Sequence, residues 1–302
     1  MPYSYDDILN CKDRTDEELC RDYKNLVDFK ADANPRKFCG NNTLYYYQFQ
    51  NLLNCRRDSK NYLTLKEVMD NPVEKEKLWK ETIHRNRRDK DPLCSPTDVY
   101  ECHRINRGSI VFFKSSTAKF IYKKYNATSV LDPTAGWGGR LLGAMSMGIK
   151  YTGIDTNINL KSGYDRMIED TLKRDLLLNK KDYNMIWESC LDVDYSKLDY
   201  DCILTSPPYV NLELYEGMIP FENKDEFYLK FLIPLMFKIY KYLKQGGYMC
   251  INISPTMYKK FISYGKIRNP DEVIDLRQQM GKQYKTKSQD EIYVWIKNRP
   301  LY

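Results

Sequence analysis

The sequence has few histidines and no closely spaced pair of cysteines. Its 302 residues include two histidines, His84 and His103, and nine cysteines, none of which forms a Cys-x-x-Cys pair. Zinc sites draw their ligands from such pairs and from histidines at fixed spacing, so we expect no metal site. An odd number of scattered cysteines is typical of reduced thiols in an intracellular protein, which is the location we expect.

Long apolar runs are also missing. No stretch is long enough to cross a bilayer, and residues 1–7 contain neither the basic nor the apolar segment of a secretion signal. We therefore expect no contact with a membrane. Hydrophobic residues make up 42% of the chain and charged residues 29%, which predicts a folded core. The net charge of +7 is compatible with a polyanionic partner but does not establish one.

The pattern of the chain changes near residue 107. Residues 1–107 are polar and irregular, and we expect a mainly helical region there. In residues 108–302, strand-like runs alternate with amphipathic helical stretches, which predicts an α/β domain with a doubly wound parallel sheet. The expected strands are 129–131, 151–154, 185–187, 201–204, 248–253 and 291–296, and the expected helices are 139–147, 160–178 and 225–243.

A basic stretch, residues 255–290, separates the last two predicted strands. It includes Lys259 and Lys260. We expect this stretch to leave the sheet. Two interpretations stay open: a solvated loop or helix, and an arm that contacts phosphate groups.

A glycine-rich turn follows the first predicted strand. The sequence runs Val-Leu-Asp-Pro-Thr-Ala-Gly-Trp-Gly-Gly, so the strand ends in Asp132. Gly136 and Gly138 allow a tight turn and a close approach of the backbone to a ligand. The spacing differs from the dinucleotide fingerprint Gly-x-Gly-x-x-Gly, because the next glycine after Gly139 is Gly143. In a doubly wound sheet, ligands bind beyond the carboxyl ends of such strands.

The second predicted strand ends in Asp155. A carboxylate at this place suits hydrogen bonding to the hydroxyls of a ribose. The alternative is that Asp155 caps the helix that follows. We favour the ribose contact, because the glycine-rich turn lies upstream at the expected spacing.

The most informative string is Thr205-Ser-Pro-Pro-Tyr209, which follows a strand-like run. Two consecutive prolines fix φ and remove two N–H donors, whereas the neighbouring carbonyls stay free as acceptors. A rigid turn rich in acceptors and followed by a tyrosine suits a planar group with an exposed amino group. The alternative is a turn that only closes a strand, with Tyr209 in the core.

Together the two motifs resemble those of a known family. Residues 132–139 resemble the Asp-Pro-Phe-x-Gly-x-Gly motif of the amino methyltransferases, and residues 206–209 resemble their (Asn/Asp/Ser)-Pro-Pro-(Tyr/Phe) motif. Over residues 108–297 the chain is similar to the DNA methyltransferases that modify adenine N6 or cytosine N4. The resemblance implies a Rossmann-like, mostly parallel, seven-stranded sheet and S-adenosylmethionine as cofactor.

The resemblance also implies roles for individual residues. Cofactor contacts are expected from the glycine-rich turn, from the ends of the second and third strands, and from the segment before the first strand. They are Asp132, Pro133, Thr134, Ala135, Gly136, Gly138, Asp155, Asp192 and Phe113.

The catalytic residues implied are Ser206, Pro207, Pro208 and Tyr209. The lone pair of an exocyclic amine is delocalised into the ring, so acceptance of its hydrogens by the Ser206 hydroxyl and the Pro207 carbonyl favours attack on the methyl group. Tyr209 stacks on the target ring, which must leave the duplex or be single-stranded. Within this family, a serine at position 206 slightly favours cytosine N4 over adenine N6 as the methylated atom.

No separate recognition domain fits between the two motifs, so residues 1–107 and 255–290 are the candidates for contact with DNA. The basic residues considered there are Arg85, Arg87, Arg88, Arg104, Lys259 and Lys260. Methylation of RNA or of a protein glutamine, and a non-catalytic subunit of the same fold, stay open as alternatives. A partner from a restriction-modification pair and the oligomeric state stay open too.

Overall fold

The computed structural model describes residues 1–30, 39–55, 63–88, 93–107, 110–208, 221–276 and 291–302. Within these ranges the side chains at positions 87 and 88 are not described. No helix among the described residues is long and apolar enough to pass through a bilayer.

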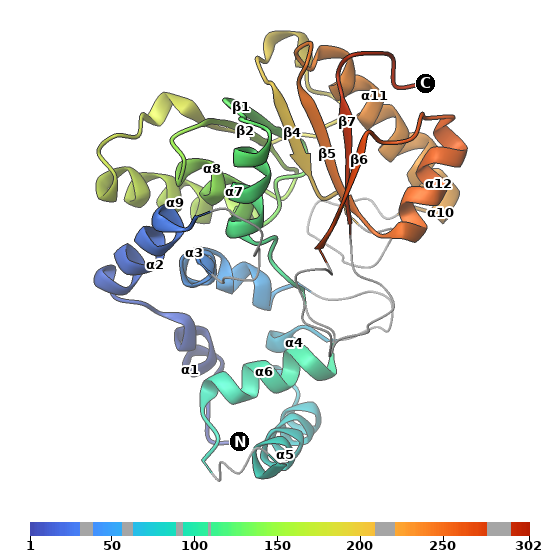
Figure 1. Cartoon of the computed structure of the whole chain (residues 1–302). Helices are drawn as coiled ribbons and strands as arrows, with labels where there is room; N and C mark the ends of the chain where they lie inside the picture. The colour runs from blue at the N-terminus through green and yellow to red at the C-terminus, as the bar shows by residue number, and fades with distance from the viewer. Residues whose placement is uncertain (31–38, 56–62, 89–92, 108–109, 209–220, 277–290) are drawn as a thin grey trace.

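A seven-stranded sheet organises the second part of the chain (Figure 1). Its strands are β1 (Ser129–Asp132), β2 (Lys150–Ile154), β3 (Tyr183–Ile186), β4 (Cys202–Thr205), β5 (Tyr248–Ile253), β6 (Glu272–Asp275) and β7 (Glu291–Ile296). Their order is β3-β2-β1-β4-β5-β7-β6. Strands β1 to β5 pair in parallel, and β7 is antiparallel to both of its neighbours. The predicted doubly wound, mostly parallel sheet is confirmed.

The strand order places two loops together. The chain builds outward from β1 to β2 and β3, and then returns to add β4 on the other side of β1. The carboxyl ends of β1 and β4 are therefore neighbours at the point where the order reverses, which is where ligands bind in such sheets. The glycine-rich turn follows β1, and the Pro-Pro turn follows β4.

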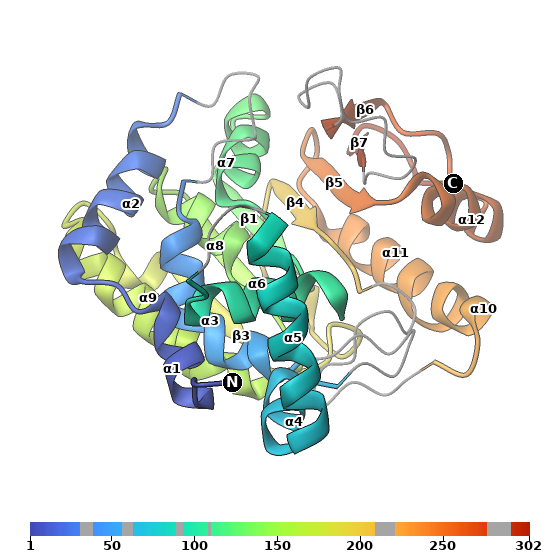
Figure 2. The ribbon, with the colours of Figure 1, turned by 90° about the horizontal axis from the view of Figure 1, so that it is seen from below.

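Helices cover both faces of the sheet (Figures 1 and 2). One face carries α7 (Ser115–Lys124), α8 (Gly139–Met145) and α9 (Lys161–Arg174), and the other carries α10 (Lys224–Glu226), α11 (Ile233–Tyr242) and α12 (Pro255–Gly265). Alternate residues of β4 serve the two layers, since Cys202 and Leu204 belong to one hydrophobic core and Ile203 to the other. This alternation is the consequence of the two-residue period of a strand.

The described residues of the first part of the chain are mainly helical, as expected. Its helices are α1 (Tyr5–Leu9), α2 (Asp16–Asp28), α3 (Asn41–Leu53), α4 (Leu65–Asp70), α5 (Pro72–Arg88) and α6 (Pro96–Asn106). Capping boxes begin α1, α2, α4 and α6, with a serine or threonine at the N-cap and an acidic residue three positions on. In Figure 1, α4, α5 and α6 lie below the sheet.

Helices α2 and α3 share a hydrophobic core with α7, α8 and α9. Leu26 and Leu44 are fully buried in the same cluster as Leu142 and Met167. The Tyr23 hydroxyl donates to the Met145 carbonyl across 3.1 Å. The first helices thus form part of the layer that covers the sheet.

Two predicted segments differ from the structure. Residues 255–290 do not simply leave the sheet: 255–265 form α12, and 272–275 return as the edge strand β6. The strand escaped prediction because it has four residues and only Ile274 is buried, so there is no alternation to recognise. The helix predicted for 160–178 ends at Arg174, and the apolar residues Leu176 and Leu177 are exposed.

A prediction follows for Leu44, which lies between the two parts of the chain. A β-carbon at Gly139, at the start of α8, would lie 3.4 Å from Leu44 Cδ1. We expect Leu44→Ala to lower the free energy of unfolding by about 2–5 kcal/mol in a single cooperative transition. Leu177→Ala is the matched control and should change it by less than about 0.5 kcal/mol. Urea unfolding followed by circular dichroism measures both; a separate early transition in the Leu44 variant would contradict the shared core.

Candidate active site

The loop after β1 holds the turn after β4 through the hydroxyl of Thr134. Its Oγ1 lies 2.7 Å from Thr205 Oγ1 and 3.2 Å from the carbonyl oxygen of Ser206. A hydroxyl has one hydrogen, so Thr134 donates to the Ser206 carbonyl and accepts from Thr205. The two sequence motifs are therefore joined by hydrogen bonds, although 71 positions separate Thr134 from Thr205.

The glycines of the turn are required for two different reasons: backbone conformation and close packing. Gly136 and Gly138 have φ of 58° and 87°, in the left-handed region that favours glycine. Among the described residues, a β-carbon on Gly136 would meet only the Thr134 carbonyl oxygen, at 3.9 Å, so there is room beside this residue. A β-carbon on Gly139 would lie 1.9 Å from the Phe113 carbonyl oxygen. Gly139 thus permits the segment before α7 to cross the start of α8, a role that the sequence did not indicate.

Asp132 is completely buried beneath the turn. Its Oδ2 accepts hydrogen bonds from Arg140 Nε (2.6 Å) and from the Tyr151 hydroxyl (2.7 Å). Burial alone would lower the pKa of Arg140, but the charge and hydrogen bond of Asp132 raise it above its usual value. Asp132 Oδ1 has no hydrogen-bond partner among the residues that the structure describes.

Arg140 also holds the glycine-rich turn in place through its guanidinium group. Its Nη2 donates to the Thr134 carbonyl, and its guanidinium lies 5.0 Å from the centre of the Phe113 ring. The buried pair of Asp132 and Arg140 therefore ties together the end of β1, the turn and the segment before α7. Sequence reasoning missed Arg140, since an arginine at the start of a helix gives no sign of its burial.

Asp155, at the end of β2, accepts two backbone hydrogen bonds. Gly136 N donates to Oδ2 across 2.7 Å, and Asn157 N donates to Oδ1 across 2.9 Å. Burial raises the pKa of the carboxyl to about 6, although both hydrogen bonds act to lower it. The alternative interpretation as a helix cap is wrong, because Asn157 caps the short helix Ile158–Leu160 that follows.

The turn after β4 presents acceptors beside the glycine-rich loop. Pro207 is buried, whereas Ser206 and Pro208 are partly exposed. The Ser206 hydroxyl accepts a hydrogen bond of 3.3 Å from Asn252 Nδ2, which comes from the adjacent strand β5. Tyr209 lies outside the described residues.

The remaining predicted cofactor residues lie around this centre. Pro133 and Ala135 are buried, and Ala135 N donates to the Ile154 carbonyl across 2.9 Å, which attaches the turn to β2. Phe113 is half-buried against Arg140, and Asp192 is exposed beyond the end of β3.

The predicted DNA-contacting residues have mixed surroundings. Arg104 donates twice to Glu101, across 2.6 and 3.0 Å, and Lys260 lies 3.8 Å from Asp225. A phosphate would have to compete with these carboxylates. Lys259 is exposed on α12, and Arg85 is half-buried on α5. The side chains of Arg87 and Arg88 lie outside the described residues.

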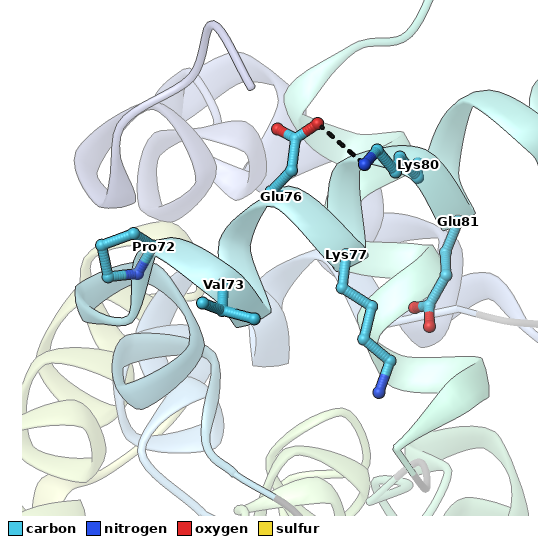
Figure 3. A pocket seen from close by; sticks show the side chains of 6 residues that line it. All are labelled: Pro72, Val73, Glu76, Lys77, Lys80 and Glu81. Carbon is cyan, nitrogen blue, oxygen red and sulfur yellow. Dashed lines mark ion pairs between the residues drawn. The ribbon is translucent and has the colours of Figure 1, made fainter.

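A hollow of about 640 Å³ lies on α5, on a face of the N-terminal helices (Figure 3). It is lined by Pro72, Val73, Glu76, Lys77, Lys80 and Glu81. An ion pair of 3.6 Å joins Glu76 and Lys80. None of the residues of the two motifs lines it.

These features define a class of protein. A parallel sheet of this order with a reversed β7, a glycine-rich turn after β1 and an acidic residue at the end of β2 are the features of the S-adenosylmethionine-dependent methyltransferases. The site fits the cofactor: the described residues leave room beside Gly136, Asp155 carries a carboxylate, and Asp132 Oδ1 lacks a partner among the described residues.

A comparison with protein families points to a narrower group within this class. Residues 200–301, about a third of the chain, match the model of the N6/N4 methyltransferase family, which is described as DNA methylase. The match includes the turn after β4 and ends in the last residues of the chain, whereas β1 and β2 precede it. The predicted methyltransferase activity and cofactor are confirmed, and the family indicates a nucleic acid as the class of substrate.

Solved structures of similar fold come from several bacteria. A protein described as a class I S-adenosylmethionine-dependent methyltransferase from Listeria monocytogenes has 14% identity and a TM-score of 0.46, over 94% of this chain and 89% of that one. An RNA methyltransferase from Salinibacter ruber, bound to S-adenosyl-L-homocysteine, has 15% identity and a TM-score of 0.40, over 64% and 97% of the two chains. Scores this low do not decide the substrate. No curated protein matches the sequence.

We expect the buried pair below the turn to be costly to break. Arg140→Met leaves the Asp132 carboxylate buried beside Tyr151 alone, which should lower the free energy of unfolding by about 3–5 kcal/mol. The matched control is Lys24→Met, which removes an exposed ion pair of 3.0 Å with Asp28 and should cost less than about 1 kcal/mol. Thermal and urea unfolding measure the difference; equal losses in the two variants would contradict this account of Arg140.

Proposed function

We propose that the protein transfers a methyl group from S-adenosylmethionine to an exocyclic amino nitrogen of a base in DNA. The observation that carries the proposal is the hydrogen-bonded junction of Thr134 with Thr205 and Ser206, which sets an acceptor-rich turn directly beside the glycine-rich loop. Cytosine N4 is slightly favoured over adenine N6, because position 206 is a serine.

The cofactor supplies an electrophilic methyl group when it is bound. The residues proposed to hold it are the turn from Asp132 to Gly138, with Asp155 for the ribose hydroxyls and Phe113 and Asp192 at the margins. Asp155 is suited to its part because its carboxylate keeps lone pairs beyond those used by Gly136 and Asn157. Asp132 Oδ1, which lacks a described partner, is suited to accept from the amino group of the methionine part.

The turn after β4 makes the amino group a better nucleophile. The Ser206 hydroxyl and the Pro207 carbonyl accept hydrogen bonds from its two hydrogens, so its lone pair turns out of the plane of the ring towards the methyl group. As the nitrogen takes the methyl group, S-adenosyl-L-homocysteine is the leaving group, and the nitrogen releases one proton to solvent. Thr134 assists by holding the Ser206 carbonyl, since this bond restricts the peptide that precedes Pro207. Orientation and preorganised acceptors supply the rate enhancement. Pro208 keeps the turn rigid, and Tyr209 is proposed to stack on the ring.

A base inside a duplex cannot reach this turn. Enzymes that act on a base take it out of the stack at a cost of a few kcal/mol, or use single-stranded DNA. Residues 1–107 are proposed as the region that contacts DNA, beside a methyltransferase domain of residues 108–302. Lys259 on α12 is exposed, and it is proposed with Arg85, Arg87, Arg88, Arg104 and Lys260 to contact phosphates.

The substrate class is tested directly with labelled cofactor. The protein is incubated with methyl-labelled S-adenosylmethionine and, separately, with duplex DNA, single-stranded DNA, RNA and a protein extract. We expect label in DNA. Label confined to RNA or to protein would overturn the DNA proposal, and cofactor binding without label in any substrate would favour a non-catalytic subunit.

Ser206→Ala tests the catalytic turn. Loss of the hydroxyl removes one acceptor for the amino hydrogens, and we expect methyl transfer to fall by roughly 100-fold or more with unchanged cofactor affinity. Ser196→Ala, at an exposed serine, is the matched control and should keep full activity. Initial rates and calorimetric cofactor titrations give both values. Full activity of the Ser206 variant would show that the turn has another purpose.

The pKa of Asp155 predicts how cofactor binding depends on pH. Since burial raises this pKa to about 6, the carboxyl is ionised above pH 6 and can accept from the ribose, and it becomes protonated as the pH falls through this value. We expect the affinity to fall by up to about tenfold per pH unit below 6. Asp155→Asn should bind weakly and lack this dependence.

Calorimetric titrations from about pH 5 to 8 compare the two proteins. Any titration of the cofactor itself affects the pH profiles of both proteins equally, so it does not contribute to the difference between them. If wild type and Asp155→Asn show the same profile, Asp155 does not bind the ribose.

A further inference from the structure

Asn252 is an amide placed in the apolar interior of β5. Its neighbours Ile251 and Ile253 are fully buried, and Asn252 itself is 7% exposed. Residue 251 pairs with Thr205, so position 252 lies beside Ser206 at the ends of the two parallel strands. One end of the amide is used, because Nδ2 donates to Ser206 Oγ across 3.3 Å.

The other end of this amide is unsatisfied. Asn252 Oδ1 is buried and has no hydrogen-bond partner among the described residues. A buried acceptor without a donor costs about 1–3 kcal/mol, and a β-branched apolar residue would suit a central strand better. Turning the amide would exchange the oxygen for an unpaired nitrogen, so either orientation leaves one end without a partner. Such groups in a native structure require an explanation.

We propose that Asn252 is a catalytic residue whose Oδ1 accepts a hydrogen of the target amino group. This inference rests on the proposed function. The bonded contact with Ser206 puts the Asn252 amide at the same turn that receives the amine. The amino hydrogen that faces Ser206 then lies between Ser206 Oγ and Asn252 Oδ1 in a three-centre hydrogen bond.

The chemistry of the two side chains explains why one serine is insufficient. The Ser206 hydroxyl carries its own hydrogen and already accepts from Asn252 Nδ2, so one of its lone pairs remains for the amine. An amide oxygen is an acceptor only. As the amine nitrogen attacks, it gains positive charge, and a second oxygen fixed by β5 stabilises that charge without reorganisation. Asn252 thus supplies, from the neighbouring strand, the amide oxygen that a serine at position 206 lacks.

The test compares four proteins with the wild type. Asn252→Ala should lower kcat by about 100-fold, with cofactor affinity within about twofold. Asn184→Ala, at an exposed asparagine of β3, is the matched control and should keep full activity. Ser206→Asn combined with Asn252→Ala returns an amide oxygen to the turn, and we expect it to recover at least about tenfold of the lost rate. Asn252→Leu, which removes the unsatisfied amide, should unfold at the same temperature as the wild type or higher.

Each result bears on the proposal. Activity of Asn252→Ala within about threefold of the wild type, or no recovery in the double variant, would overturn it. A lower unfolding temperature for Asn252→Leu would also overturn it, because it would give the amide a structural purpose. If the wild-type protein labels RNA or protein instead of DNA, DNA is rejected as the substrate. The same variants are then assayed on the substrate that was labelled, so that the role of Asn252 is still tested. Absence of label everywhere would reject both proposals.

Discussion

The contact on which the site depends is the hydroxyl of Thr134 between two loops. It accepts from Thr205 and donates to the Ser206 carbonyl, and so it fixes the turn after β4 against the loop after β1. The contact exists because β1 and β4 are neighbours in a sheet whose order reverses between them. Methyl transfer needs its donor and acceptor in line and in close contact, and this junction holds the two loops in a fixed relative position.

Two carboxylates beside this junction have contrasting surroundings. Asp132 is fully buried and paired with Arg140 and Tyr151, which makes it a support for the turn. Asp155 is held by two backbone N–H groups, which leave further lone pairs of its carboxylate for a ligand, and burial raises its pKa to about 6. Asp132 therefore supports the loop through Oδ2 and leaves only Oδ1 for the proposed contact with the cofactor, whereas both oxygens of Asp155 accept from the backbone beside the proposed ribose site.

Much of the fold could be predicted from the sequence, because strands β5 and β7 are mostly apolar and the motifs lie at strand ends. The edge strand β6 could not, since four residues with one buried side chain carry no period. The motif residues of the site could be named, but Arg140 and Asn252 could not. Their importance lies in burial beside residues distant in sequence, at Asp132 and Ser206, and only the folded chain brings these together.

The most direct test of the account is the identity of the modified nucleoside. DNA treated with the protein and S-adenosylmethionine is digested to nucleosides, and each nucleoside is identified by mass and by comparison with standards. We expect 2′-deoxycytidine carrying the methyl group on N4, or 2′-deoxyadenosine carrying it on N6, because the turn after β4 is proposed to bind an exocyclic amino group. A methyl group on a ring carbon, or none on any base, would contradict it.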